Sequence, residues 1–398
     1  MDIAFSKKEN IKDNILVLLV PLIIFLMSVT RNGNLNLLYF SAPFVFLLSV
    51  REKSFSIKKL VIFYIPFLII FLVTLTFSKY YNNLGKSLIY LLKLFLCLIL
   101  FVSASSSYIR KDLFEKCVNN LIYIIFFFTL FAIVTQSDFL WRFNDTINAY
   151  SSTRLQLFFM EPSELSEVCG VILIYKCVNL REKNINSLDF FHIIAILIPL
   201  FLSAGLSGIV YSFLAIIFFF FISESSFFKK GKISKTMIVL FLALSIFLIS
   251  FFLFQNNKIF ARIIAVLEGK DGSFNYRYVR AVDALGFIFR DTNGIGVGLG
   301  NLRTERTAAI LSDFGLLSFS NSYLFFIAEG GILALLYLMF LISYCFTSIY
   351  KQKNYYFRKC NKYALLFFLI IIQITGGYFT DPFLWMMTGL VISKNGVM

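Results

Sequence analysis

The sequence predicts an all-α, polytopic membrane protein that forms a single domain over residues 1–398. Hydrophobic residues make up 59% of the chain, which contains 51 phenylalanines, and its mean hydropathy is +0.81. This composition excludes a soluble globule, because it far exceeds the apolar share of an average soluble domain. The apolar segments do not alternate with polar residues as the strands of a membrane barrel do. Helices are therefore the remaining way to satisfy the backbone in lipid.

The spans follow one another with short connections. A helix that crosses the bilayer needs roughly 20 mostly apolar residues, and about twelve segments fit that requirement. No linker rich in Pro, Gly or Ser interrupts them, so we expect one membrane unit. The last segment is short. The predicted spans are centred near residues 22, 42, 68, 95, 127, 171, 196, 214, 245, 335, 369 and 387.

The distribution of charge predicts the orientation. The formal net charge is +15, which in a soluble protein would suggest a nucleic-acid partner. Here 23 of the 37 Lys and Arg residues lie in alternate loops, so we expect no nucleic acid and place those loops in the cytoplasm by the positive-inside rule. Both termini are then cytoplasmic.

Two of the opposite, extracytoplasmic loops are longer than a hairpin: residues 136–160 and residues 255–321. The second holds six of the thirteen arginines. Within it, residues 275–290 repeat polar side chains at helical spacing, which predicts a helix that lies either in the membrane interface or against the bundle, apolar face down. We expect that face to carry Val279, Val282, Gly286 and Phe289.

Arginine and lysine are sorted between the two sides. The extracytoplasmic loops contain nine Arg and four Lys, and the cytoplasmic loops contain four Arg and nineteen Lys. Because guanidinium offers a planar fork of donors that matches phosphate, the outer arginines predict a site for an anionic group such as a diphosphate. Pairing with local acids or lipid headgroups is the alternative. The candidates are Arg154, Arg277, Arg280, Arg290, Arg303 and Arg306.

Glycine occupies every second position from Gly294 to Gly300. Glycine lets a backbone come close to a ligand and point its N–H groups at an anion. Gly296 and Gly298 are therefore candidate binding residues. A simple turn before the next span explains the run equally well.

Three glutamates, Glu161, Glu164 and Glu167, open a span at its extracytoplasmic end. Carboxylates in the first turn of a helix are favoured by its dipole, which accounts for Glu161 and Glu164. Glu167 lies about a turn deeper, where an ionisable side chain points to function. We take all three as candidate bases or sugar-hydroxyl acceptors and rank Glu161 first.

Several residues limit the chemistry. His192, the single histidine, begins a span at the cytoplasmic side, and the six cysteines fall in spans or cytoplasmic loops. We therefore expect neither a metal site nor a cofactor. Lys93 lies within a span, roughly 10 Å below Lys86 at 1.5 Å per residue. It either snorkels to the surface or pairs with a glutamate or phosphate.

The layout resembles the O-antigen polymerases, which assemble oligosaccharide repeat units into surface polysaccharide. The resemblance is one of spans, a large C-terminal-half loop and a few segments. Those segments are Arg154-Leu-Gln-Leu-Phe-Phe-Met-Glu161-Pro-Ser-Glu164, Gly296-Val-Gly298-Leu-Gly300-Asn301, Asn321-Ser-Tyr-Leu-Phe-Phe-Ile-Ala-Glu329-Gly-Gly-Ile332 and Asp381-Pro-Phe-Leu-Trp385.

The resemblance implies a glycosyltransferase-C-like membrane fold and a specific reaction. A growing glycan would move from undecaprenyl diphosphate onto the next lipid-linked repeat unit, with inversion and without metal, at the outer face of the inner membrane. The product would be O-antigen or capsule. Arginines, Asn301 and Asn321 would hold substrate and a glutamate would activate the acceptor. A chain-length regulator and a flippase would be partners.

Two other functions remain open. The related O-antigen ligases carry a histidine and a polar residue ahead of the glycine of the third segment. This chain has Ser320-Asn321 at that spacing before Gly331, which favours polymerase. A flippase or transporter of lipid-linked oligosaccharide is also polytopic, but does not need so long an outer loop.

Overall fold

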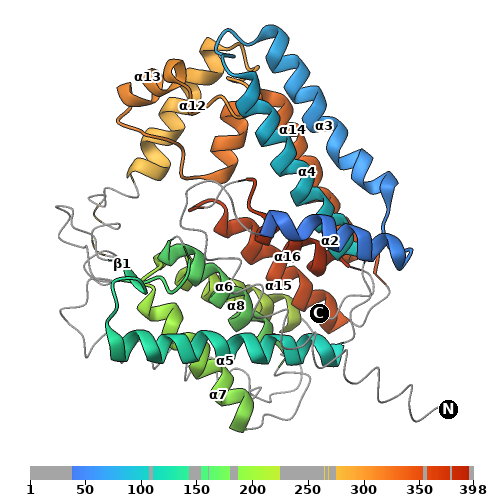
Figure 1. Cartoon of the computed structure of the whole chain (residues 1–398), viewed down its shortest axis with the longest axis vertical. Helices are drawn as coiled ribbons and strands as arrows, with labels where there is room; N and C mark the ends of the chain where they lie inside the picture. The colour runs from blue at the N-terminus through green and yellow to red at the C-terminus, as the bar shows by residue number, and fades with distance from the viewer. Residues whose placement is uncertain are drawn as a thin grey trace.

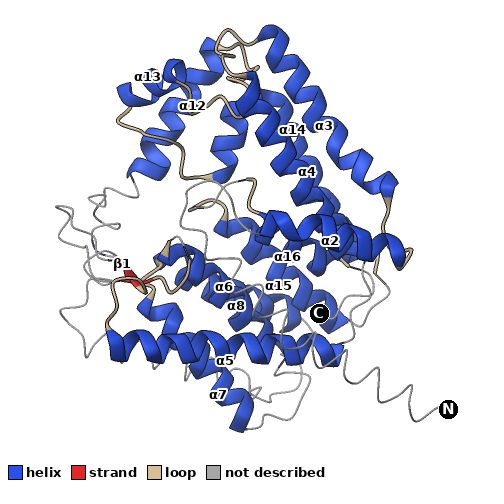
Figure 2. Ribbon diagram, viewed as in Figure 1, coloured by secondary structure: helices blue, strands red, loops and turns tan. Residues whose placement is uncertain are grey.

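The computed structural model describes residues 38–106, 111–142, 154–159, 161–179, 187–224, 264, 268, 275–352, 356–376 and 379–393. Helices dominate these residues (Figure 2). The strands among them are two residues each: β1 (Trp141–Arg142) pairs antiparallel with β2 (Arg154–Leu155) in the 136–160 loop. The all-α prediction is confirmed. Both termini and the predicted spans near residues 22 and 245 lie outside the described ranges.

Each of the other predicted span centres falls in a helix. Five helices are long and apolar enough to cross a membrane: Ile57–Phe77, Leu84–Ser106, Phe114–Thr135, Leu206–Ser223 and Ser322–Tyr350. The chain is thus a multi-pass membrane protein, and twelve spans stay a prediction. The helices at the centres are α2 (Leu38–Arg51), α3 (Ile57–Phe77), α4 (Leu84–Ser106), α5 (Lys111–Thr135), α6 (Pro162–Asn179), α7 (Ser187–Leu202), α8 (Leu206–Glu224), α14 (Ser322–Tyr350), α15 (Tyr356–Ile372) and α16 (Pro382–Ile392).

The outer faces of these helices are apolar, as lipid contact requires. On α3, Phe63 and Phe67 point inward and are buried, whereas Leu72 is 57% exposed and Phe77 is 68% exposed. On α14, Met339 is 60% exposed. A water-soluble protein does not expose whole apolar helix faces of this kind. In the hydrocarbon of a bilayer, the exposure of these apolar faces carries no free-energy penalty.

The helices form two groups, with α15 and α16 between them (Figure 1). In the first, α4 packs against α2, α3 and α16, while α14 packs against α3. In the second, α6 packs against α7, α8 and α15. Small residues allow the closest approaches: a Cβ on Gly389 of α16 would lie 2.4 Å from the Phe101 carbonyl oxygen of α4. Close backbone contact at glycine is typical of helix packing in membranes.

The large loop folds into helices of its own. A single π-helical turn, η1 (Asn275–Val279), leads into α12 (Arg280–Asp291), and α13 (Glu305–Asp313) follows. The predicted helix over 275–290 is confirmed in position, but two of its predicted apolar-face residues do not pack against the bundle. Val279 and Val282 are more than half exposed. The buried face carries Ala281, Ala284 and Ile288, because small side chains let α12 lie close to α14.

The two ends of α3 test the predicted orientation. Glu52 lies in the exposed turn before α3. Ser312, on α13, is exposed beyond the opposite end. A 21-residue helix is about 31 Å long at 1.5 Å per residue, enough to cross the hydrocarbon. In intact cells, Ser312→Cys should react with an impermeant thiol reagent, and Glu52→Cys should react only after the membrane is opened. The wild-type protein, with its own cysteines, is the blank. The opposite pattern would reverse the orientation.

Candidate functional site

The glycine run, residues 294–300, is a buried loop that only glycine can build. Gly294, Gly296, Gly298 and Gly300 all have positive φ, between 73° and 103°. A Cβ on Gly296 would lie 2.6 Å from both the Glu329 carbonyl oxygen and the Gly331 nitrogen. Glycine alternates along the run because these positions have a left-handed backbone and leave no room for a Cβ atom.

This glycine loop enters a break in α14. Gly331 has φ 60° and ψ −143°, so the helix is interrupted there. The loop supplies the missing partners: Val297 N–H donates to Ala328 O at 3.0 Å, and Gly298 N–H donates to Glu329 O at 2.8 Å. In return, Ile332 N–H donates to Gly294 O at 2.8 Å. Broken helices are tolerated in membranes where other groups satisfy the freed backbone in this way.

Asn301 ties the same loop to the turn between α3 and α4. Its side-chain oxygen accepts from the N–H groups of Asn82 and Asn83, at 3.1 and 2.8 Å. Its amide donates to Ser87 Oγ at 2.8 Å. Asn321 instead caps α14, where it accepts from Tyr323 N–H at 3.0 Å and Leu324 N–H at 3.1 Å. Both asparagines are thus bound within the protein.

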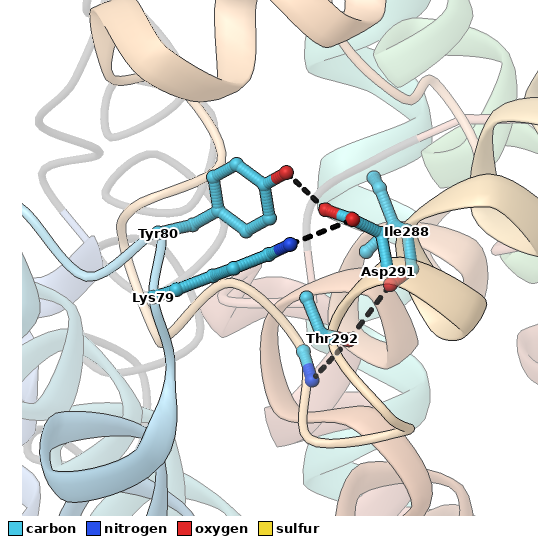
Figure 3. Close-up of polar contacts among 6 residues, drawn as sticks. Lys79, Tyr80, Ile288, Asp291 and Thr292 are labelled. Carbon is cyan, nitrogen blue, oxygen red and sulfur yellow. Dashed lines mark hydrogen bonds and ion pairs between the residues drawn. The ribbon is translucent and has the colours of Figure 1, made fainter.

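A charged contact joins the same turn to the end of α12 (Figure 3). Lys79 Nζ lies 2.7 Å from Asp291 Oδ1, and Tyr80 donates to Asp291 Oδ2. The hydrogen bond from Lys79, followed by that from Tyr80, holds the pKa of Asp291 below its ordinary value. The bond to Asp291 likewise raises the pKa of Lys79. The lowered pKa of Asp291 stabilises the folded state at pH values above the ordinary pKa of an aspartate. The raised pKa of Lys79 stabilises it at pH values below the ordinary pKa of a lysine. The contact therefore persists across neutral pH.

The N–H groups of the glycine loop already have partners. Gly296 N–H donates to Thr292 Oγ1 at 3.1 Å, and Gly300 N–H donates to Glu329 Oε1 at 2.9 Å. With Gly298 bound to the α14 backbone, all three glycines use their donors inside the chain. The structure therefore gives the run a structural role, and a part in substrate binding stays a prediction.

The candidate arginines do not converge on one point. Arg154 donates to the Ser203 and Ala204 carbonyl oxygens, at 3.0 and 3.3 Å, just beyond the C-terminus of α7. Arg290 donates to Gly286 O of its own helix at 3.2 Å. Arg280 is exposed and lies against Gly315. Cations at helix C-termini and on surfaces of this kind serve the fold.

Arg277 differs from the other candidate arginines, because it lies on η1, which contacts several elements at once. Arg277 Nη1 donates to Thr375 O, just after α15. On one side of it, Tyr276 Oη accepts from Leu317 N–H at 2.9 Å. On the other, Tyr278 Oη lies 3.4 Å from Tyr211 Oη on α8. Three consecutive side chains thus fix the Arg277 guanidinium between the two helix groups.

The three glutamates differ in their surroundings. Glu161 is exposed, accepts from Ser163 Oγ at 3.0 Å and lies 4.0 Å from Arg142 Nη1. Glu164 is half-buried in the first turn of α6. Glu167 is only 5% exposed, and its carboxyl group forms no hydrogen bond with any residue that the structure describes. Asp381, Glu164, Glu161 and Arg277 are the charges that act on it.

Two further acids, a lysine and an arginine are buried or partly buried near these elements or lie at their ends, and we call the whole set the charged belt: Glu167, Arg277, Asp381, Lys93, Arg303 and Glu329. Asp381 caps α16, accepting from Phe383 N–H at 2.9 Å, and its charge reaches Glu167. The guanidinium of Arg303 acts on both Lys93 and Glu329. Sequence reasoning assigned no role to Asp381 or Glu329. An acid within an otherwise apolar 29-residue helix is the signal that would have found Glu329.

The buried glycine loop yields a prediction with a matched control. Gly296→Ala places a methyl group at positive φ against the α14 backbone, so we expect a loss of about 1–3 kcal/mol of stability. Gly286, within α12, has no neighbouring atom within 4 Å of a Cβ, so Gly286→Ala should be neutral or stabilising. Thermal unfolding of the detergent-purified protein measures both. Equal midpoints for the two variants would contradict the insertion of the loop.

No protein-family model matches the chain, and a search of curated proteins finds no significant match.

Proposed function

We propose that this protein is a glycosyltransferase that polymerises undecaprenyl-diphosphate-linked repeat units into a surface polysaccharide. The observation that carries the proposal is Glu167, a buried carboxyl group within reach of the charges of Asp381 and Arg277, where the large loop meets the helix bundle. Inverting glycosyl transfer needs a base for the acceptor hydroxyl and positive charge for the departing diphosphate. Glu167 would supply the base, and Arg277, whose charge acts on it, would supply the positive charge.

In the proposed reaction, the acceptor hydroxyl oxygen attacks the anomeric carbon of the donor sugar, and its proton passes to Glu167. The bond between that carbon and the diphosphate oxygen breaks, and the electron pair leaves with undecaprenyl diphosphate. We propose Glu167, rather than Glu161, as the base. Glu161 is exposed and lies near Arg142, whereas Glu167 is shielded from bulk water.

The position of the belt suits lipid-linked substrates. Glu167 lies in the second turn of α6, Asp381 at the start of α16, and Arg277 on η1. The charges of Asp381 and Arg277 both act on Glu167, and Arg277 itself belongs to the large loop. Sugars attached to a lipid diphosphate would be presented at that boundary, because the polyprenyl chain stays in the hydrocarbon.

The lipid-linked glycans of a strain that lacks this protein test the proposal against its alternatives. A polymerase deletion should leave single repeat units on the surface. Long chains trapped on the carrier would instead identify a ligase, and units trapped inside the cell would identify a flippase. Either of the last two profiles would overturn the proposal.

Glu167→Gln tests the assignment of the base. Glutamine keeps the size of the side chain but cannot accept the proton, so we expect chain elongation to fall by about 10²–10⁴-fold. Glu161→Gln, at an exposed position of the same segment, should retain most of the activity. Thermal unfolding of both variants controls for folding. Normal long glycan from Glu167→Gln would exclude this residue as the base.

A further inference from the structure

A pocket of about 480 Å³ lies where α14, α15 and α16 meet (Figure 1). Residues from both sides of the break in α14 line it, with Tyr323 before the break and Leu338 after it. Its deeper wall is aliphatic and includes Leu341 of α14, Leu366 of α15 and Leu384 of α16. The pocket is partly open and lies between helices of the membrane bundle. Hydrocarbon is therefore the medium that reaches it.

Aromatic side chains form the rim of the pocket at the end where the large loop joins the bundle. Tyr323 Oη donates to Ile370 O at 2.8 Å, and Trp385 Nε1 donates to Phe379 O at 2.6 Å. All four residues line the pocket. The rings of Phe379 and Trp385 also meet edge to face, with their centroids 5.4 Å apart. Because these contacts fix the rings to the backbone, the rim is formed before any ligand arrives.

Gln373 is the polar side chain of the pocket whose hydrogen bonding is incomplete. Its Nε2 makes one long hydrogen bond, 3.4 Å to Leu369 O of the preceding turn. Its Oε1 accepts no hydrogen bond from the part of the chain that the structure describes. A carboxamide inside a membrane protein is normally paired with other polar groups. Gln373 therefore keeps hydrogen-bonding capacity for a polar group at the rim.

The rim also adjoins the contact that holds Arg277. Thr375, whose carbonyl oxygen accepts from Arg277 Nη1, follows Gln373 by two residues, so their Cα atoms lie at most about 7 Å apart. On the α16 side, Asp381 lies between the rim residues Phe379 and Trp385 in the chain and caps the helix. The apolar pocket thus ends at residues that border the proposed reaction site.

A single hydrocarbon chain suits this pocket. A phosphate or a sugar would lose its hydration against the aliphatic wall without gaining hydrogen bonds there. A lipid chain gains no hydrophobic free energy by leaving the bilayer, because both surroundings are apolar, but it gains dispersion contacts with fixed side chains. A phospholipid carries two chains on one glycerol, whereas a polyprenyl carrier has one chain joined directly to its phosphate. The carrier can therefore place its chain in the pocket and its phosphates at the rim.

We propose that this pocket holds the first isoprene units of the donor's polyprenyl chain and thereby places the diphosphate at the rim, beside Gln373 and Arg277. The inference rests on the proposed function, in which the diphosphate departs at Arg277. Gln373 would donate from its amide to an oxygen of the first phosphate. The pocket would fix the position of the anomeric carbon, because the sugar follows the diphosphate.

The test is photo-crosslinking of the full-length protein in phosphatidylcholine nanodiscs with undecaprenyl diphosphate that carries a diazirine near the phosphate end of its chain. Residues 366–370, on the α15 wall, should be labelled, and unlabelled undecaprenyl diphosphate should compete. Leu341→Trp fills the pocket from the opposite wall and should reduce this labelling about tenfold, because the chain loses its carbon contacts. Leu336→Trp is the matched control. Leu336 is also on α14 but 56% exposed on the lipid-facing side, so labelling should not change.

A second variant tests the rim without filling the pocket. Gln373→Leu removes the amide from a half-buried position. It should raise the concentration of undecaprenyl diphosphate needed for half-maximal competition about tenfold, as the loss of a hydrogen bond to a charged group does. Competition by undecaprenol, which has no phosphate, should not change. Thermal unfolding controls for the folding of each variant.

Three results would overturn the proposal. Unchanged labelling in a folded Leu341→Trp would show that the chain lies elsewhere. Unchanged competition in Gln373→Leu would show that the diphosphate does not lie at the rim. Equal labelling of residues 366–370 by a diazirine phosphatidylglycerol would show that the pocket takes any lipid chain.

The result separates from that of the proposed function. If the deletion strain shows a ligase or flippase profile while Leu341→Trp loses labelling, the pocket stands as a carrier site and the proposed function fails. If the profile is that of a polymerase and labelling is unchanged, the function stands and this inference fails.

Discussion

The rest of the structure depends on the insertion of the glycine loop into the break of α14. The Val297 and Gly298 N–H groups satisfy carbonyl oxygens of α14, while Gly294 O accepts from the far side of the break. Without the loop, a membrane helix would be interrupted with its polar backbone groups unpaired in a low-dielectric medium, at a cost of several kcal/mol per group. Without the break, the loop would have no place to enter. Each element therefore makes the other possible.

This mutual dependence positions the charged groups. The loop binds Glu329 through Gly300 and is anchored to the α3–α4 turn through Asn301, so Arg303 emerges beside α4. On the other side, η1 and its tyrosines hold Arg277 at the Thr375 carbonyl oxygen, from where its charge acts on Glu167. The large loop positions these groups because it is folded against the helices.

Local pattern predicted the helices, but long-range contacts decided what the polar residues do. Apolar segments predicted a helix at every span centre that falls in the described residues, because a bilayer-crossing helix needs a long apolar run. The face of α12 that packs on the bundle carries Ala281 and Ala284, which are small enough to pack, whereas the larger Val279 and Val282 are exposed. The enrichment of arginine in the predicted outer loops could be recognised from the sequence. That Arg154 binds carbonyl groups beyond α7 depends on contacts some 50 residues away, which no local spacing reveals. Glu167, by contrast, was picked out by its depth in a span.

Reconstitution of the purified protein tests the central claim most directly. Proteoliposomes that contain only this chain and one lipid-linked repeat unit should convert it into a ladder of longer glycans on the carrier, with one undecaprenyl diphosphate released for each bond formed. The same ladder should form without any added protein partner, because base and cations all belong to this chain. A folded protein that leaves the substrate as single repeat units would contradict the account.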